Sequence, residues 1–472
     1  MIKSKYDLIV IGTGVAASHA ASKCRSAGWN VAIVDYQPFG GTCALRGCDP
    51  KKVLVSAEEA IDWVNRMQGK GVSGKDIRIN WFDLAHFKRS FTDPFPKARE
   101  DAFLKAGIVP FHGHARFIGP TTLEVEGNEL SGRYVLVAAG AKPAKLNIPG
   151  EEHVLISDQF LDLDKLPSRI LFIGGGYISF EFAHIAARAG AEVTIIHRGI
   201  TPLENFDLDL VKKLIQRTED LGVHIRLKTQ VNRIEKAQFD NNGFVVYTTT
   251  TTSSSPNQSS SSSSSTDRYN AKFQTDMVVH GAGRIPNFTE LDLEVAGVKF
   301  GEKGIIVNEY LQSVSNPAVY AAGDAAASGN PPLTPSAEHE GRTAANNLLN
   351  GNHKISNTYG SIPSIVFTIP PMAAVGLREE TAKKQGLRFR TNYEEDTSSW
   401  YSSRRIGENF SAFKVLIEEG SNRILGAHIL GPNAEEQINI FALAIQRGIT
   451  SEELREIIFA YPTGSSDIVY ML

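Results

Sequence analysis

The sequence predicts an α/β fold with two Rossmann-like nucleotide-binding units and a C-terminal α+β segment. Two stretches, starting near residues 6 and 170, each combine a buried strand, a glycine-rich loop, a helix and a second strand. Near the C-terminus, strands are predicted at 413–417 and 424–428 around a Glu-Glu-Gly turn, followed by helices at 434–447 and 451–459. A chain of 472 residues has room for about two to four domains.

The first unit carries a phosphate-binding loop and a terminal acid. Its predicted elements are a strand at 6–11, an alanine-rich helix to about Ala27 and a strand at 30–34. Gly12 permits the tight turn, Gly14 lets the backbone approach a pyrophosphate, and Ala17 allows close packing of the helix. The phosphate then lies at a helix N-terminus. Asp35, at the end of the second strand, can accept the ribose hydroxyls of an adenosine.

The second unit ends differently. Its predicted elements are a strand at 170–173, a helix from about Tyr177 to Ala189 and a strand at 192–196, with Gly174 and Gly176 in the loop. The strand ends at His197-Arg198 and not at an acid. A carboxylate there favours the free ribose of NADH, whereas Arg198 can pair with a 2′-phosphate, which favours NADPH. Arg198 as an ordinary solvated charge, with Glu204 close by, keeps NADH open.

Two cysteines, Cys43 and Cys48, lie five positions apart just beyond the first unit. On an ideal helix this spacing separates the Cα atoms by about 8 to 9 Å, beyond the usual disulfide range, so a bridge needs a distorted turn. Gly47 and Pro50 favour such a turn, and a strained, accessible disulfide is readily reduced. The pair is interpreted as redox-active, with a structural disulfide, a metal pair and two unrelated thiols as alternatives; Cys24 is expected in the core.

Composition argues for a cytoplasmic protein without a nucleic-acid or membrane partner. The net charge is −3, and no apolar run reaches the length of a transmembrane helix. No secretory signal is visible, because Met1 to Lys5 lead directly into a strand. No second Cys or His pair flanks the two cysteines, so no metal site is expected.

Further motifs extend the pattern along nearly the whole chain. They are Val135–Gly140, Gly281–Asn287, Val319–Asp324 and Leu333–Ala337. With the two nucleotide units and the dithiol, the chain resembles the class I pyridine nucleotide-disulfide oxidoreductases, which include glutathione reductase, dihydrolipoamide dehydrogenase and mercuric reductase. The resemblance implies a split FAD domain at 1–147 and 271–347, an NAD(P) domain at 148–270 and a dimerisation domain at 348–472.

The resemblance also implies roles around the flavin. Cys48 is expected as the charge-transfer thiolate against the isoalloxazine and Cys43 as the sulfur that exchanges with the acceptor. Lys51 is expected near flavin N5, paired with Glu181, unless both are solvated surface charges. Tyr177 resembles the aromatic gate over the flavin, and an ordinary buried tyrosine is the alternative.

The remaining cofactor contacts follow from the same motifs. Leu333 and Thr334 are expected where a helix N-terminus points at the flavin pyrimidine edge, and Asp324 on the ribityl chain. The other residues expected to bind FAD are Gly12, Gly14, Ala17, Asp35, Gly41, Thr42, Lys52, Ala139, Gly140, Gly283, Arg284 and Gly323. Those expected to bind NADPH, with NADH as the alternative, are Gly174, Gly176, Tyr177, Ile178, His197 and Arg198.

The C-terminal motif departs from the family pattern. Where glutathione and lipoamide reductases have His-Pro-Thr, this chain has Tyr461-Pro462-Thr463. The resemblance places Tyr461 at the dithiol of the neighbouring subunit of a homodimer, but a phenol is a poor base near neutrality. We therefore expect electrons to pass from NADPH through FAD and the Cys43-Cys48 disulfide to a small disulfide or similar acceptor. A quinone or metal-ion reductase and a slow flavoprotein redox sensor are the alternatives.

A Thr/Ser-rich run occupies residues 248–266. Such a composition cannot bury enough apolar surface to offset the entropy of ordering. The run is expected to extend a hairpin of the NAD(P) domain, to be mobile and to be dispensable, with a phosphorylation platform as the alternative.

Overall fold

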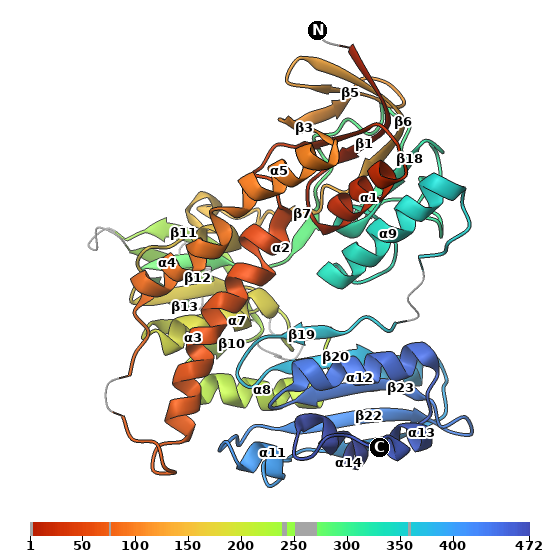
Figure 1. Ribbon diagram of the computed structural model, residues 1–472. Helices are drawn as coiled ribbons and strands as arrows, with labels where there is room; N and C mark the ends of the chain where they lie inside the picture. Colours follow the sequence, from red (N-terminus) through yellow and green to blue (C-terminus); the bar gives the residue numbers. More distant parts are fainter. Residues whose placement is uncertain (1–2, 75–76, 238–242, 251–270, 357–359) are drawn as a thin grey trace, which may run out of the picture. The chain divides into compact units, whose positions relative to one another are not determined.

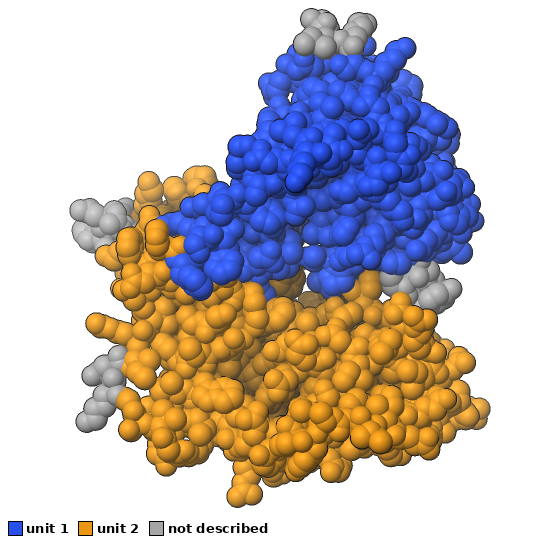
Figure 2. All heavy atoms as spheres, in the orientation of Figure 1, with its two compact units in different colours: residues 1–51, 87–144, 284–358 blue, residues 52–86, 145–283, 359–472 orange. Residues whose placement is uncertain are grey.

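The computed structural model describes residues 3–74, 77–237, 243–250, 271–356 and 360–472. The chain divides into two compact units, each of which is described by itself (Figure 2). Unit 1 comprises residues 1–51, 87–144 and 284–358, and unit 2 comprises residues 52–86, 145–283 and 359–472.

Unit 1 is built on a sheet with the strand order β3-β2-β1-β6-β5-β4, and β18 also pairs with β6. The pairs β1–β2, β1–β6, β2–β3 and β6–β18 are parallel, while β4–β5–β6 is antiparallel. The strands are β1 (Lys3–Ile11), β2 (Val31–Asp35), β3 (Val109–His112), β4 (Ala115–Phe117), β5 (Thr122–Val125), β6 (Asn128–Val137) and β18 (Val319–Ala321). Smaller pairs are β7 (Ala141–Pro143) with β15 (Arg284–Pro286) and β16 (Phe300–Gly301) with β17 (Gly304–Ile305).

Helices α1 (Val15–Ser26) and α9 (Thr334–Asn350) lie side by side in unit 1 (Figure 1). Small residues allow this approach, since a Cβ at Gly341 would lie 2.4 Å from the Ala16 carbonyl oxygen. The other helices of this part are α2 (Gly41–Arg46), α5 (Phe95–Ala106) and the first turn of α3 (Cys48–Arg66); α4 (Trp81–Thr92) spans the division. The buried strands and the alanines of α1 form the core that fixes the loops at the carboxyl ends of β1 and β2.

Unit 2 contains a second parallel sheet with the order β10-β9-β8-β14. Its elements are β8 (Arg169–Ile173), α7 (Tyr177–Arg188), β9 (Glu192–Ile196), α8 (Leu208–Asp220), β10 (His224–Arg226) and β14 (Met277–His280), preceded by α6 (Ser157–Leu161). An antiparallel sheet, β11 (Thr229–Lys236), β12 (Phe244–Thr250) and β13 (Ala271–Thr275), accompanies it. Residues 271–280 thus pair within unit 2, and the chain re-enters unit 1 at Arg284 and not at 271. The division into three domains stays a prediction.

The C-terminal part of unit 2 is an α+β layer. Its antiparallel sheet has the order β19-β20-β23-β22-β21, and α12 packs on β20 and β23. The strands are β19 (Ser364–Val366), β20 (Met372–Gly376), β21 (Phe389–Glu394), β22 (Ala412–Glu418) and β23 (Ile424–Leu430). The helices are α10 (Glu379–Lys384), α11 (Tyr401–Arg404), α12 (Ala434–Arg447), α13 (Ser451–Glu456) and α14 (Ile468–Met471).

The predicted elements are confirmed to within a few residues, with one shortening. The predicted helix 451–459 ends at Glu456, because the backbone of Ile457 is extended. Strand β12, which includes residues 248–250 of the Thr/Ser-rich run, pairs with β13, and residues 251–270 lie outside the described part of the chain. Within the described residues, no helix is long and apolar enough to cross a membrane.

Candidate active site

The two cysteines lie on successive helices. Helix α2 ends at Arg46, Gly47 interrupts it, and α3 begins at Cys48. A Cβ at Gly47 would lie 2.9 Å from the Thr42 carbonyl oxygen, so the glycine allows the chain to turn tightly between the thiols. The distorted turn predicted from the spacing is therefore present.

The structure holds Cys43 and Cys48 as free thiols that are hydrogen-bonded to each other. The pKa of Cys48 is lowered to about 6, chiefly by the hydrogen bond from Cys43 and also by the Thr334 hydroxyl and the Lys51 charge, while burial opposes them. The same coupling, together with burial, raises the pKa of Cys43. Reduced at neutral pH, the pair therefore holds a thiolate on Cys48 and a thiol on Cys43.

Two polar groups contact the thiols. The Cys48 Sγ lies 3.4 Å from the Thr334 Oγ1 at the first residue of α9. The Cys43 Sγ lies 3.9 Å from the Asp49 Oδ1, and burial raises the pKa of this carboxyl group. Sequence reasoning missed Asp49; its place directly after Cys48, at the start of α3, was the available signal.

The loop after β1 has the shape that a pyrophosphate needs. Gly12 has φ +103°, and a Cβ there would lie 2.3 Å from the Ala138 carbonyl oxygen. A Cβ at Gly41 would lie 2.4 Å from the Cα of Gly14, which forms the uncapped N-terminus of α1. Backbone alone therefore lines this position, as an anionic group at a helix N-terminus requires.

Asp35 at the end of β2 is held in place by its neighbours. Its Oδ2 accepts hydrogen bonds from the Thr13 N–H at 2.9 Å and the Thr13 hydroxyl at 2.6 Å. The next residue, Tyr36, stacks on His114 with ring centroids 4.4 Å apart. Sequence reasoning did not single out this aromatic pair, because the two residues meet only through the pairing of β2 with β3.

The turn that carries Asp324 is tied to α9 by a buried acid. Glu340 accepts hydrogen bonds from the Gly323 N–H at 2.7 Å and the Asn330 Nδ2 at 2.8 Å, and from the Ser328 hydroxyl. Burial raises the pKa of Asp324, and the Arg284 charge opposes this. The predicted residues Gly323, Asp324, Arg284 and Thr334 thus belong to one region of unit 1.

The second nucleotide loop has the same backbone shape. Gly174 has φ +107°, and a Cβ there would lie 2.3 Å from the Gly281 carbonyl oxygen. Gly176 forms the N-terminus of α7 without a side-chain cap. His197 folds back on the loop: its Nδ1 accepts from the Gly175 N–H at 3.2 Å, and its Nε2 lies 3.0 Å from the Thr201 carbonyl oxygen. Arg198 is exposed.

The imidazole of His197 is neutral in this arrangement. A ring whose Nδ1 accepts and whose Nε2 donates carries a single proton. Burial, the largest cause, lowers the pKa of His197, and the carbonyl and Glu204 only partly oppose it. His197 therefore shapes the loop, which leaves Arg198 as the cation at the end of β9.

For three further predicted residues, the observed exposure excludes the alternative interpretation. Lys51 is 8% exposed and Glu181 is 3% exposed, so neither is a solvated surface charge. Glu181 accepts a hydrogen bond from the Phe367 N–H at 2.8 Å within unit 2. Tyr177, at the start of α7, is 44% exposed, so it is not an ordinary buried tyrosine.

The remaining predicted residues are paired, exposed or buried as follows. Lys52 pairs with Glu59 at 2.6 Å, and Tyr461 is 77% exposed. Cys24 is fully buried in the core, as expected, and burial raises its pKa to about 12. Thr42, Ala139 and Gly140 lie in unit 1, whereas Ile178 and Gly283 lie in unit 2. Among the described residues no group of three or more His, Cys, Asp or Glu side chains could hold a metal ion.

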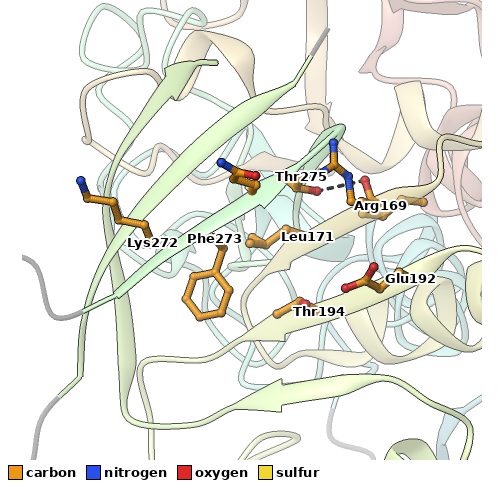
Figure 3. A pocket seen from close by; sticks show the side chains of 9 residues that line it. Arg169, Leu171, Glu192, Thr194, Lys272, Phe273 and Thr275 are labelled. Carbon is orange, nitrogen blue, oxygen red and sulfur yellow. Dashed lines mark hydrogen bonds between the residues drawn. The ribbon is translucent and has the colours of Figure 1, made fainter. Parts of the chain in front are cut away.

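A pocket of about 220 Å³ lies elsewhere in unit 2 (Figure 3). Arg169, Leu171, Glu192, Thr194, Lys272, Phe273 and Thr275 are among the residues that line it. The Thr275 hydroxyl donates to the Arg169 carbonyl oxygen at 2.9 Å. The lining begins at the amino ends of β8 and β9, whereas nucleotides bind at carboxyl ends of parallel strands. The pocket is therefore separate from the loop at Gly174.

Two family descriptions match this chain. "Pyridine nucleotide-disulphide oxidoreductase" matches residues 6–341, and the dimerisation domain of the same family matches residues 362–472. A glutathione reductase of Burkholderia cepacia is 32% identical over 99% of both chains. A mercuric reductase of Staphylococcus aureus is 31% identical over 97% of this chain and 80% of its own length.

Solved structures show the same fold. The HOCl-induced flavoprotein disulfide reductase RclA from Escherichia coli, described also as a Cu(II) complex, matches with a TM-score of 0.85 and 25% identity over 99% of both chains.

The chain belongs to the pyridine nucleotide-disulphide oxidoreductase family. It is an FAD- and NAD(P)H-dependent oxidoreductase with a redox-active cysteine pair, and its C-terminal residues form a dimerisation domain that supports a homodimer. The two glycine loops, each at a helix N-terminus without a side-chain cap, fit the two nucleotides that this class binds.

Proposed function

We propose that this protein passes electron pairs from NADPH to a small disulfide, with Cys48 as the sulfur next to the flavin and Cys43 as the sulfur that attacks the acceptor. The division of charge between the two thiols carries the proposal: the pKa of Cys48 is lowered to about 6 and that of Cys43 is raised. A thiolate on Cys48 is the form that can donate charge to an oxidised ring, and a thiol on Cys43 is the form that exchanges with a substrate once it loses its proton.

The flavin would be held by unit 1. Gly12, Gly14 and Asp35 would take the adenosine diphosphate part, and Asp324 the ribityl chain. Bound there, FAD supplies two-electron transfer between nicotinamide and disulfide. The chain's own groups then place charge: Lys51 and the Thr334 hydroxyl favour a thiolate on Cys48.

The preference for NADPH is supported by the end of β9. No acid follows this strand, His197 is occupied by the loop, and Arg198 is exposed and free to face a phosphate-bearing ribose. The Arg198 guanidinium would pair there with the 2′-phosphate of NADPH, as arginine and phosphate groups commonly do. NADH remains the second donor.

The proposed homodimer shares its active sites, with Tyr461 serving the neighbouring subunit. High exposure of the C-terminal segment supports this, since Ile458 is 97% exposed and Tyr461 is 77% exposed. As a phenol, Tyr461 would donate a hydrogen bond to the departing sulfur and would not act as its base. The lack of a membrane-spanning helix in the described residues is compatible with a cytoplasmic location.

A metal-ion reductase is the second candidate. The similar proteins include mercuric reductases and a Cu(II) complex of RclA, and a dithiol is a suitable ligand for soft metal ions. In that case the metal ion is the acceptor, and Asp49 with Cys43 would contact it.

An acceptor panel with matched cysteine variants tests the proposal. The holoenzyme, C43S and C48S are reduced anaerobically with NADPH, then mixed with a small disulfide, a quinone or Cu(II). We expect C43S to keep flavin reduction and a long-wavelength thiolate band but to lose disulfide turnover at least 100-fold. Full disulfide turnover in C43S would contradict the proposal, and quinone or Cu(II) turnover that exceeds disulfide turnover would favour the second candidate. Cys24→Ser, at the buried third cysteine, is the control.

A further inference from the structure

Cys43 needs a proton acceptor that the C-terminal motif does not supply. Its thiol is the protonated member of the pair, and the residue in the imidazole position of the family motif is Tyr461. A phenol keeps its own proton at neutral pH, so it cannot accept a proton from a thiol. A second group near Cys43 must take the proton.

Asp49 is the carboxylate that contacts this thiol. Its Oδ1 lies 3.9 Å from the Cys43 Sγ, so the S–H that points to the Cys48 sulfur can turn to this carboxylate instead. Asp49 follows Cys48 in the first turn of α3, so the helix that carries the thiolate also holds the acid beside the thiol. The residue is exposed overall and its carboxyl group is only partly buried, so the group can exchange protons with water.

We propose that Asp49 is the catalytic acid–base of the acceptor half-reaction and acts on the Cys43 sulfur. The inference rests on the proposed role of Cys43 as the attacking sulfur. It also explains how a member of this family works without the histidine of its C-terminal motif.

The step balances in protons and electrons. The Cys43 S–H bond breaks, its proton moves to the Asp49 carboxylate, and the new thiolate attacks one sulfur of R–S–S–R. A mixed disulfide forms, and the departing RS⁻ takes the proton from Asp49 and leaves as RSH. The Cys48 thiolate then attacks the Cys43 sulfur, which closes the Cys43–Cys48 disulfide and releases a second RS⁻ that water protonates. The dithiol loses two electrons and the acceptor gains them.

Other features of the site agree with this role. Burial raises the pKa of Asp49, which improves the carboxyl group as a proton donor to the departing thiolate. Asp49 also lies at a helix N-terminus, where an acid commonly contributes only a favourable charge–dipole interaction. The test must therefore separate chemistry from helix stability.

The experiment compares D49N with D83N in the NADPH-reduced holoenzyme. Asp83 lies in the first turn of α4, so D83N removes the same kind of helix-terminal charge. Each variant is assayed with an aliphatic disulfide, whose thiolate leaves poorly, and with an activated aromatic disulfide, whose thiolate leaves without a proton. We expect D49N to lower kcat with the aliphatic disulfide about 10- to 100-fold, at the low end of general acid–base effects, and with the aromatic one less than 3-fold.

The pH profile provides one more readout. In D49N the rate with the aliphatic disulfide should rise with pH until it approaches wild type. Equal losses with both disulfides, or no difference from D83N, would overturn the role of Asp49 while C43S remains inactive. If C43S itself turned over the aliphatic disulfide, the proposed function would fail instead. Y461F with a larger, leaving-group-dependent loss than D49N would assign the role to Tyr461.

Discussion

The β1–α1–β2 motif of unit 1 and the β8–α7–β9 motif of unit 2 have similar glycine loops, but opposite kinds of side chain lie at the ends of their second strands. In the first, the Asp35 carboxylate is an acceptor locked by two hydrogen bonds from Thr13. In the second, the ring of His197 turns back into its own loop, and a free cation follows it. The difference shows that the glycine loop defines the site for a pyrophosphate, whereas the residues at the strand end determine which ribose is accepted.

The helices that follow the two glycine loops, α1 and α7, differ as well. The buried side chains of α1 are Ala16, Ala17, Ala20, Ala21 and Cys24. Helix α7 instead buries Glu181 and His184, and its Arg188 forms an ion pair with Asp62 of α3 and lies 3.3 Å from Glu58. An apolar helix packs by shape alone, whereas a charged one must satisfy each group with a partner.

The largest expected effect comes from adding a methyl group to one glycine loop at a time. A Cβ at Gly12 or Gly174 meets a carbonyl oxygen at 2.3 Å with φ above +100°, so each alanine should cost about 2–5 kcal/mol in its own loop. We expect G12A to be purified without FAD, and G174A to keep FAD but lose reduction by NADPH. Flavin content and anaerobic stopped-flow reduction measure the two outcomes.

Matched glycines control for backbone strain alone. Gly28 after α1 and Gly190 after α7 also have positive φ, with no atom within 4 Å of an added Cβ. G28A and G190A should bind both nucleotides normally. Loss of FAD in G174A, or loss in either control, would show that the loops are not independent sites.

The buried charges of unit 2 should make its stability depend on pH. Burial raises the pKa of Glu58 to about 8 in spite of Arg188, while Asp62, Glu59 and Glu181 add repulsion. The native state therefore keeps a proton that the unfolded chain loses, so stability falls as pH rises from about 4.5 to about 8 and is constant above that. E58Q has no carboxyl group at this position that could ionise. The free energy of unfolding of E58Q minus that of wild type should therefore be larger at pH 9 than at pH 5, by on the order of 3 kcal/mol.

Urea unfolding of E58Q, E59Q and wild type at pH 5, 7 and 9 checks this. Glu59 lies beside Glu58 but points to an exposed pair with Lys52, so E59Q should follow the wild-type curve. An E58Q curve parallel to that of wild type would mean that Glu58 is ionised in the native state, held by its 3.3 Å contact with Arg188.

What the sequence could predict of this site depended on local patterns. The glycine loops, the strand ends and the helix at 434–447 follow from periodicity and turn chemistry, and the structure confirms them. The burial of Glu58 and the hydrogen bonds of Glu340 arise where separate segments meet, and the contact of Asp49 with Cys43 depends on the turn at Gly47 between α2 and α3. Residue type alone does not distinguish such an acid from a solvated one, so these groups required the tertiary structure.

A moderate effect on FAD binding is expected from removing the hydrogen bonds between Thr13 and Asp35. D35A removes the acceptor for both Thr13 hydrogen bonds, and T13V removes only the hydroxyl donor. A charged hydrogen bond contributes about 1.5–3 kcal/mol, so D35A should weaken FAD binding by roughly 10- to 100-fold and T13V by less. Flavin fluorescence during reconstitution of the apoprotein measures both, and equal affinities in D35A and wild type would remove Asp35 from the site.

The smallest effect concerns the choice of nicotinamide. Removing the cation in R198A should lower kcat/KM for NADPH about tenfold, as loss of one exposed charge pair with a phosphate predicts, and leave NADH within twofold. K212A, at an exposed lysine of α8, serves as the charge-matched control. Because His197 is tied to Gly175 and Thr201, H197Q should instead change both nicotinamides equally, through the shape of the loop. A selective loss of NADPH in H197Q and not in R198A would reverse the roles of the two residues, and the difference between the strand ends would then lie in the imidazole.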